Sequence, residues 1–483
     1  MEILERPPAD PGSPTSRVVA LLAALVLGGV LIIVQNAGPV EQVFAPGPTP
    51  EEVSEQAASA VAPPTPAEPF TLSARFAVQA QNAHPIIAGD PDATMTTLDA
   101  WALTPADRVR AAVVAGELQG EDRALERLRS LQETFAEGTP LRADVDDLLT
   151  VYTEGPDALP ESAAERIAAH HGFFGEVALT HGLDDSDPRR APLVTGGARL
   201  FALLSVIGLG LLVVGVLGFA AFITAIVLVS LRKVKSGLDP VEPGGSVFLE
   251  AYALFSGGFL LLMLALKPLS KVVQDETWMT VIQVCAQWML LASPLWPLIR
   301  GMGWHRYTQA IGWHRGKGVF REIGAGIAGY LAGLPLLALG IGITLGLVAV
   351  VTVFRAAAGL GEPPPPENAL FDLAASNNPA ILLLFFALAT IWAPLCEESI
   401  FRGALYRHLR GRAGIVVSAI ASAFIFGLSH AYGPILVFPV VMLGVTFALM
   451  REWRGSLIAP MTAHALHNAT VSIMAYSVLR MIS

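Results

Sequence analysis

Residues 380–402 read AILLLFFALATIWAPLCEESIFR, an apolar run that ends in two adjacent carboxylates, Glu397 and Glu398, followed by Arg402. The run has nearly the length, about 20 residues, that a helix needs to cross the hydrocarbon core of a bilayer. Ionisable side chains inside such helices are rare, usually face the interior of the bundle and mark functional sites. This stretch therefore predicts both a membrane helix and a candidate site at its polar end.

The composition of the whole chain agrees with a membrane protein. Of its 483 residues, 53% are hydrophobic and 15% are charged, whereas soluble proteins carry about 25% charged residues. The sequence has no basic tract of the nucleic-acid-binding type, so neither DNA nor RNA is an expected partner. The two cysteines have no expected covalent or catalytic role. Cys285 and Cys396 lie in apolar runs, and no disulfide framework is expected. Cys396 is interpreted as a small buried hydrophobic residue rather than as a thiol nucleophile.

Apolar segments of near-spanning length recur along the chain. They cover residues 18–34, 200–231, 247–266, 278–299, 323–354, 380–395, 415–431, 435–450 and 457–479. Each is close to the roughly 20 residues of a membrane-spanning helix. The sequence therefore predicts an all-α fold, a polytopic transmembrane helix bundle of about nine spans that is surrounded by the lipid bilayer.

Basic residues gather in connections between these segments and set the expected orientation. They lie at 232–235, 300–321, 402–412 and 451–454. Positive charge marks the cytoplasmic side of a membrane, and alternating spans then place the acidic region 36–196 outside the cytoplasm. The high Ala, Gly and Pro content and this arrangement of domains indicate a bacterial source. The expected location is therefore the bacterial cytoplasmic (inner) membrane, crossed several times.

These features divide the chain into regions. The predicted regions are an N-terminal anchor helix at 1–35, a Pro/Ala-rich linker at 36–90, an acidic extracytoplasmic helical domain at 91–196, membrane helices at 197–374 and a membrane core with the polar residues at 375–483. The first segment is interpreted as a retained anchor rather than a cleaved signal peptide.

The predicted domain at 91–196 has its own local signals. Thr104-Pro105-Ala106-Asp107 has the pattern of a helix start. His170 and His171 are interpreted as solvent-facing residues rather than as a metal site. An unidentified partner for this domain stays an open alternative.

Three more polar residues, His430, His464 and Asn468, lie in apolar settings near the C-terminus. The chain turns at 411–414, about 15 residues after Glu397 and about 17 before His430. In a helical hairpin that rises 1.5 Å per residue, both side chains lie roughly 24 Å from the turn. They are therefore expected to face one another, in the cytoplasmic half of the bilayer.

Spacing within helices pairs the other residues. His464 and Asn468 are four residues apart and share one helix face. Glu398 and Arg402 have the same spacing, which predicts a buried salt bridge. Glu397 points about 100° away from Glu398 in a regular helix. The two acids are therefore expected to have different roles.

Peptide hydrolysis uses residues of these types. It needs an activated water molecule, a base that deprotonates it, and donors for the tetrahedral oxyanion. A carboxylate with a histidine can supply the base, and a second histidine with an asparagine amide can supply the donors. Alternatively, Glu397, His430 and His464 can hold a divalent metal such as zinc, with water in the open position. The residues alone leave both versions open.

At these residues the chain resembles the CPBP family, the CAAX-protease and bacteriocin-processing membrane proteins that include type II CAAX prenyl endopeptidases. The matching parts are Glu397-Glu398-Ser399-Ile400-Phe401-Arg402, Phe426-Gly427-Leu428-Ser429-His430 and His464-Ala465-Leu466-His467-Asn468. The flanks, Phe401-Arg402-Gly403 and Arg454-Gly455-Ser456-Leu457-Ile458-Ala459-Pro460, are also similar to the family. The resemblance covers residues 375–475, about a fifth of the chain.

The resemblance implies roles for these residues. Glu397 would activate water together with His430, His464 and Asn468 would stabilise the oxyanion, and Glu398 and Arg402 would support them. It makes 375–483 the catalytic membrane core. The family has been described both as metalloproteases and as glutamate-dependent enzymes, so a zinc cofactor stays open. The domain at 91–196 is not part of the family core.

The predicted function is an intramembrane endopeptidase that cuts a peptide bond near the cytoplasmic leaflet. Its expected partner is a peptide or protein substrate in or at the membrane. Two other classes stay as alternatives, a non-catalytic membrane scaffold or receptor and a metal or solute transporter. The transporter is disfavoured because the sequence lacks the internal repeats of that class.

Overall fold

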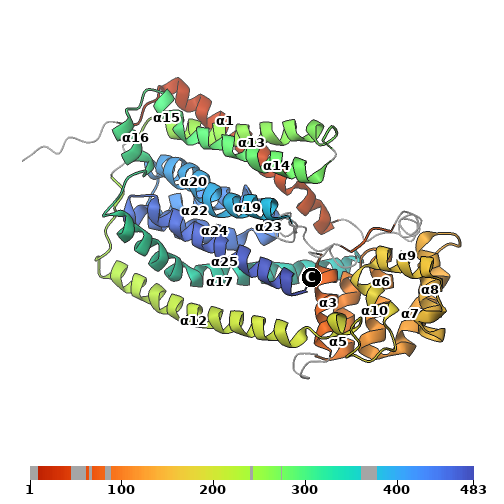
Figure 1. Cartoon of the computed structure of the whole chain (residues 1–483). Helices are drawn as coiled ribbons and strands as arrows, with labels where there is room; N and C mark the ends of the chain where they lie inside the picture. Colours follow the sequence, from red (N-terminus) through yellow and green to blue (C-terminus); the bar gives the residue numbers. More distant parts are fainter. Residues whose placement is uncertain are drawn as a thin grey trace, which may run out of the picture. The chain divides into compact units, whose positions relative to one another are not determined.

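In the computed structural model, the described residues are 9–44, 61–64, 68–81, 89–239, 243–273, 275–360 and 378–482. Every regular element among them is a helix and no strand occurs there, which confirms the predicted all-α fold (Figure 1). The chain divides into two compact units. The first, here called the membrane unit, comprises Met1–Val43, Gly210–Val351 and Ser376–Ile473, and the second comprises Phe44–Leu209, Thr352–Ala375 and Met474–Ser483.

The second unit contains a helical domain with a hydrophobic core of its own. Its helices are α3 (Pro69–Ala80), α5 (Pro91–Trp101), α6 (Pro105–Gln119), α7 (Glu121–Thr134), α8 (Pro140–Glu154), a 3₁₀ turn (Pro156–Ala158), α9 (Glu161–His171), α10 (Phe173–Leu179) and α11 (Ala191–Val194). Thr104 Oγ1 accepts the backbone N–H of Asp107 at 3.1 Å, and Pro105 lies in the first turn of α6. The cap and the fixed φ of proline start this helix where the sequence predicts it.

The boundaries of this domain differ from the predicted ones. Helix α3 lies inside the predicted linker 36–90, yet Phe70 and Val78 are buried in the core of the domain. Helix α1 (Pro14–Phe44) also continues past residue 35. Helix α3 has only 12 residues, and the sequence around it is rich in Pro and Ala. The composition of this region therefore predicted a linker rather than a helix. The remainder of the predicted linker falls largely outside the described residues.

The prediction that His170 and His171 face solvent is wrong for His171, whose exposed fraction is 1%. His171 follows the buried Ile167 by four residues, so both lie on the inward face of α9. Asp144 of α8 is fully buried, and its Oδ2 lies 2.6 Å from His170 Nδ1 and 3.2 Å from His171 Nε2. Arg166 Nε donates to Asp144 Oδ1 at 3.0 Å. These contacts tie α9 to α8.

Protonation of this cluster is constrained by burial. Burial lowers the pKa of His171, and its hydrogen bond with Asp144 offsets this only in part. His171 Nδ1 is buried without a hydrogen-bond partner among the described residues, so the neutral ring that donates from Nε2 fits best. Burial raises the pKa of Asp144, but hydrogen bonds from His171 and His170 outweigh it and hold that pKa below its ordinary value.

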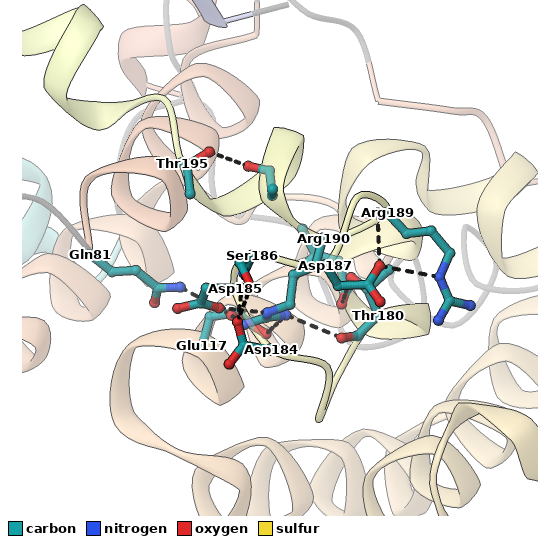
Figure 2. A network of polar contacts seen from close by, with 12 residues as sticks. Gln81, Glu117, Thr180, Asp184, Asp185, Ser186, Asp187, Arg189, Arg190 and Thr195 are labelled. Atoms are coloured by element: carbon teal, nitrogen blue, oxygen red, sulfur yellow. Dashed lines mark hydrogen bonds and ion pairs between the residues drawn. The ribbon is translucent and has the colours of Figure 1, made fainter.

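A second polar network fixes the segment that precedes α12 (Figure 2). Arg190 Nη2 donates to Glu117 Oε2 at 2.6 Å, and Arg190 Nε donates to Asp185 Oδ1 at 2.8 Å. Gln81, at the end of α3, donates from Nε2 to Glu117 Oε2 at 3.1 Å. Glu117 of α6 therefore joins α3 to this segment of the chain.

The membrane unit is built from long apolar helices and shorter connecting ones. They are α1, α12 (Gly197–Ser230), α13 (Val247–Leu269), α14 (Glu276–Gln287), a 3₁₀ segment (Trp288–Leu295), α15 (Trp296–Ile299), α16 (Trp304–Ile311), α17 (Val319–Ala358), a run from α19 (Pro379–Ala387) to α21 (Tyr406–Arg410), α22 (Ile415–Leu428), α23 (Gly433–Leu436), α24 (Phe438–Arg454) and α25 (Ile458–Ile482). Figure 1 shows the course of these helices.

Among the described residues, six helices are long and apolar enough to cross a membrane. They are Pro14–Glu41, Ala191–Ser230, Val247–Leu269, Trp278–Ile299, Val319–Ala358 and Pro379–Arg410. The chain therefore has the helices of a multi-pass membrane protein. The other predicted spans are the helices α22, α24 and α25, of which α22 has 14 residues and α24 has 17. The count of about nine spans stays a prediction.

Helix α1 is packed into the membrane unit along its length. Near its start, Asp10 Oδ1 accepts from Arg407 Nη2 of α21 at 3.0 Å. Ala20 and Ala24 are buried in one cluster with Phe401. Further on, Asn36 Nδ2 donates at 2.8 Å to the carbonyl of Leu428, the last residue of α22.

Acidification is expected to destabilise the helical domain. The lowered pKa of His171 means that the unfolded chain binds more protons, so its contribution to stability is present above about pH 6.5 and is lost as the pH falls toward the lowered value. The protection factors of the amides in α8 and α9 of the full chain, which correct for the pH dependence of the intrinsic exchange rate, should fall between about pH 7 and about pH 5. His171→Leu should flatten this dependence, and an unchanged pH profile in that variant would contradict the role of His171.

Replacing Asn36 should reveal whether α1 is held by its contact with Leu428. Asn36→Leu removes the donor and should cost about 0.6–1.7 kcal/mol, the range for hydrogen bonds between membrane helices. Asn36→Asp should cost more, because it sets a carboxylate against the Leu428 carbonyl. Thermal unfolding of the full chain in detergent measures both. An Asn36→Asp protein as stable as the wild type would show that this contact is not formed.

Candidate active site

The polar end of the apolar run at residues 380–402 lies in an irregular helix. Between α19 and α21 the chain passes through a π-helical segment (Leu388–Trp392), helix α20 (Ala393–Glu397) and a second π-helical segment (Glu398–Leu405). π-Helical turns are rare and are found frequently at functional sites. The change from α to π geometry falls between Glu397 and Glu398, so the two acids do not follow the bearings of a regular helix.

Glu398 is the centre of a buried ion pair. Its side chain and that of Arg402 are both 0% exposed, and Arg402 Nη1 donates to Glu398 Oε1 at 2.9 Å. The Arg402 guanidinium also lies over the ring of Phe426, 4.1 Å from its centroid, and 5.3 Å from that of Phe447. The predicted pair is present. Two aromatic faces contribute cation–π attraction to a charge that has no access to water.

His464 lies between the two carboxylates. Its Nδ1 is 2.9 Å from Glu398 Oε1, and its Nε2 is 3.9 Å from Glu397 Oε2. The ring stacks on Phe447 with centroids 5.2 Å apart. Both acids therefore converge on one imidazole, which the regular-helix estimate of about 100° between them did not anticipate. Glu398 is thus more than a partner for Arg402, because it also orients His464.

His430 lies just beyond the end of α22. Its Nδ1 is 2.8 Å from the carbonyl oxygen of Phe426, and its ring stacks on Tyr432. Nδ1 must carry the proton to donate to that carbonyl, so the lone pair of a neutral ring lies on Nε2. The ring of Phe426 also contacts Phe401 at 5.0 Å between centroids. Glu397 precedes Phe401 by four residues and His430 follows Phe426 by four, which supports the predicted common level of Glu397 and His430.

Asn468 shares a helix, α25, with His464. Its Nδ2 donates at 2.7 Å to the carbonyl of Ala389, in the first π-helical segment. An amide NH₂ group has two donors, so one N–H remains beyond this bond. The contact also ties α25 to the irregular helix.

Several contacts of the site were not predicted from the sequence. Phe426 and Phe447 enclose Arg402 and His464. Phe426 begins one of the parts that resemble the CPBP family, but that pattern did not indicate these contacts, and nothing in the sequence marks Phe447. Trp313 Nε1 donates to Ser399 Oγ at 2.9 Å, next to Glu398. Its segment repeats the Gly-Trp-His-Arg pattern that contains Trp304, whose side chain is exposed. The two copies have the same residues, so the sequence did not indicate that Trp313 is near the site and Trp304 is exposed.

The residues proposed as metal ligands do not form a ligand cluster. Within the described part of the chain, no group of three or more His, Cys, Asp or Glu side chains is arranged to hold a metal ion. His464 Nδ1 is engaged by Glu398 and His430 Nδ1 by a backbone carbonyl. Cys396 is fully buried, in agreement with its interpretation as a hydrophobic residue.

Fold and site together define a multi-pass membrane protein with a buried carboxylate, arginine and histidine cluster. Residues 379–470 match the family described as "Type II CAAX prenyl endopeptidase Rce1-like". The match contains all the predicted site residues, from Glu397 to Asn468, and supports a CAAX protease-type hydrolase. Neither a curated protein nor a solved structure matches the chain.

Neutralising Glu398 should destabilise the protein more than neutralising Glu397. Glu398→Gln leaves the buried guanidinium of Arg402 without a counter-charge, which costs about 3–5 kcal/mol in buried pairs. Glu397→Gln is the matched control, because it makes the same change one residue earlier and breaks no ion pair with an arginine. Thermal unfolding in detergent compares them.

A double variant separates charge from packing at this pair. Arg402→Met in the Glu398→Gln background removes both charges and should recover part of the lost stability. Equal melting temperatures for Glu397→Gln and Glu398→Gln would contradict the division between the two acids.

Proposed function

We propose that this protein is an intramembrane endopeptidase that hydrolyses a peptide bond near the cytoplasmic leaflet. The observation that carries the proposal is the convergence of Glu397 and Glu398 on His464 within the segment that matches the prenyl endopeptidase family. A buried ion pair alone is compatible with a structural role. Two carboxylates on opposite nitrogens of one buried imidazole form an arrangement suited to proton transfer.

Glu397 is the proposed base. Its Oε2 is buried and has no hydrogen-bond partner among the described residues, so it can accept a proton from water. His430, with its lone pair on Nε2, is proposed to hold that water from the other side. The oxygen of the water then attacks the peptide carbonyl. The proton held by Glu397 passes to the leaving amine when the C–N bond breaks.

His464 and Asn468 are the proposed donors to the oxyanion. Glu398 is proposed to accept from His464 Nδ1 and thereby to direct Nε2 to the side of Glu397. For Nε2 to donate as well, His464 acts in this mechanism as the doubly protonated imidazolium between the two carboxylates. The second N–H of the Asn468 amide is available beside it, because only one is used by the Ala389 carbonyl. Fixed donors stabilise the charge that develops on the carbonyl oxygen at little reorganisation cost.

This version of the mechanism needs no metal. Zinc held by Glu397, His430 and His464 stays the alternative, and it would require His430 and His464 to present Nε2 toward a common point. His464 Nδ1 contacts Glu398 and His430 Nδ1 contacts a backbone carbonyl. Contacts of this type orient histidines that bind a metal through Nε2. Activity of the purified protein after exhaustive chelation separates the two versions.

The proposed setting is the bacterial cytoplasmic membrane. The positive-inside rule assigns the basic connection between α21 and α22 to the cytoplasm and residues 36–196 to the opposite side. The substrate would then be a peptide or protein segment that enters from the membrane. A separate partner for the helical domain at 91–196 is also proposed.

Glu397→Gln should abolish cleavage while the protein stays folded. Loss of a general base typically lowers the rate by about 10²–10⁴-fold. The measurement is a proteome-wide comparison of peptide termini in membranes from cells that carry the wild type or the variant. Glu154→Gln, which changes an exposed acid of the helical domain, is the control. Termini that persist unchanged in a folded Glu397→Gln protein would favour the scaffold or transporter alternatives.

A further inference from the structure

The membrane unit contains a cavity that the proposed chemistry does not use. It has a volume of about 680 Å³ and lies between α12, α17 and α24. Its walls are almost entirely apolar and include Phe222 and Val229 of α12, Ala332 and Leu336 of α17, and Leu449 and Trp453 of α24. The volume falls within the range of ligand-binding pockets, about 300–1,000 Å³. None of the predicted site residues lines it.

Close helix contacts set the limits of this cavity. At Gly218 a Cβ atom would lie 2.8 Å from the carbonyl of Leu331, so α12 and α17 touch there through their backbones. The lining begins at Ala221, one turn further along α12. At Gly333 a Cβ atom would lie 2.4 Å from Thr446, which brings α17 against α24. The cavity therefore lies beside the close contact between α17 and α24, and its lining on α12 begins just beyond the contact between α12 and α17.

The loop after α12 forms one end of the cavity. Gly237 N donates to the Glu452 carbonyl at 2.7 Å, and Ser236 Oγ donates to Glu452 Oε1 at 2.8 Å. These bonds fasten the loop to the end of α24. Glu452, an acid on the cavity wall, is neutralised by Arg410, whose Nε lies 3.1 Å from its Oε2. Its charge is therefore already balanced within the protein.

The same loop carries uncompensated positive charge. Arg232, Lys233 and Lys235 are exposed, and none of them forms an ion pair with another described residue. Lys235 lines the cavity. The sequence of this loop, residues 231–246, also contains two acids, Asp239 and Glu242, so three basic residues stand against two acidic ones and a small excess of positive charge remains. The apolar walls of the cavity suit a hydrocarbon chain, and the basic residues at its end suit an anionic headgroup. The cavity is therefore complementary to an anionic amphiphile.

We propose that this cavity binds one acyl chain of an anionic phospholipid, whose phosphate lies at Lys235 with Arg232 and Lys233 beside it. The occupant would support α24 from one side. On the other side of that helix, Phe447 stacks on His464. The site stands independently of the proposed peptidase chemistry, because it rests on the cavity and its charge alone.

Native mass spectrometry of the purified full chain tests this site with phosphatidylglycerol and phosphatidylcholine as probes. The wild type should retain phosphatidylglycerol preferentially. Lys235→Gln should lower its affinity about fivefold, the effect expected of one basic residue near an anionic headgroup, and leave phosphatidylcholine binding unchanged. Lys271→Gln, an exposed lysine outside the cavity, is the matched control.

Substitutions that fill the cavity test whether it binds an acyl chain. Ala332→Phe and Ala225→Phe insert a ring from opposite walls and should each reduce the binding of both lipids, whereas Ala220→Phe, at an exposed position outside the lining, should not. Lipid binding is compared for the filled variant whose melting temperature equals that of the wild type, because that variant is folded. Equal retention of the two lipids by the wild type, or undiminished binding by a folded filled variant, would overturn the proposal.

Discussion

The buried pair of Glu398 and Arg402 is the interaction on which the site depends. Both side chains are excluded from solvent, and bringing two charges into such a place is costly unless the geometry and the remaining hydrogen bonds are good. Glu398 has a second donor to Oε1, His464, while its Oε2 is buried without a hydrogen-bond partner among the described residues. Nε and Nη2 of Arg402 also lack such partners there, and two aromatic faces offset this loss in part. The pair therefore determines where His464 lies, and through it the position of α25 against the irregular helix.

Aromatic residues of neighbouring helices extend this arrangement. Phe426 of α22 contacts Arg402, His430 and His464, so one ring relates three polar groups from different parts of the chain. Phe447 of α24 stacks on His464 and also lies against Arg402. Between membrane helices, packing and polar contacts have to supply the specificity that the hydrophobic effect provides in water. The polar cluster and its aromatic enclosure are consequently one packing unit.

The sequence predicted what depends on residue type and regular spacing. It predicted the Glu398–Arg402 pair and the start of α6, because each follows from a local pattern. It missed the convergence of both acids on His464, since this depends on a change to π-helical geometry that no residue announces. It also misjudged His171, although its spacing from Ile167 was visible, because a pair of histidines was given the exposure typical of polar residues.

The contacts of α1 show that the site is not self-contained within residues 379–470. Asp10 holds α21 through Arg407 at one end, and Asn36 holds the last carbonyl of α22 at the other, two residues before His430. Both ends of the hairpin formed by α21 and α22 are thus held by the N-terminal segment 9–44, which contains α1 and lies outside the matched residues. Leu428 and His430 lie in one short turn, so the Asn36 contact fixes the backbone close to the histidine. The geometry of the site is therefore a property of the whole membrane unit.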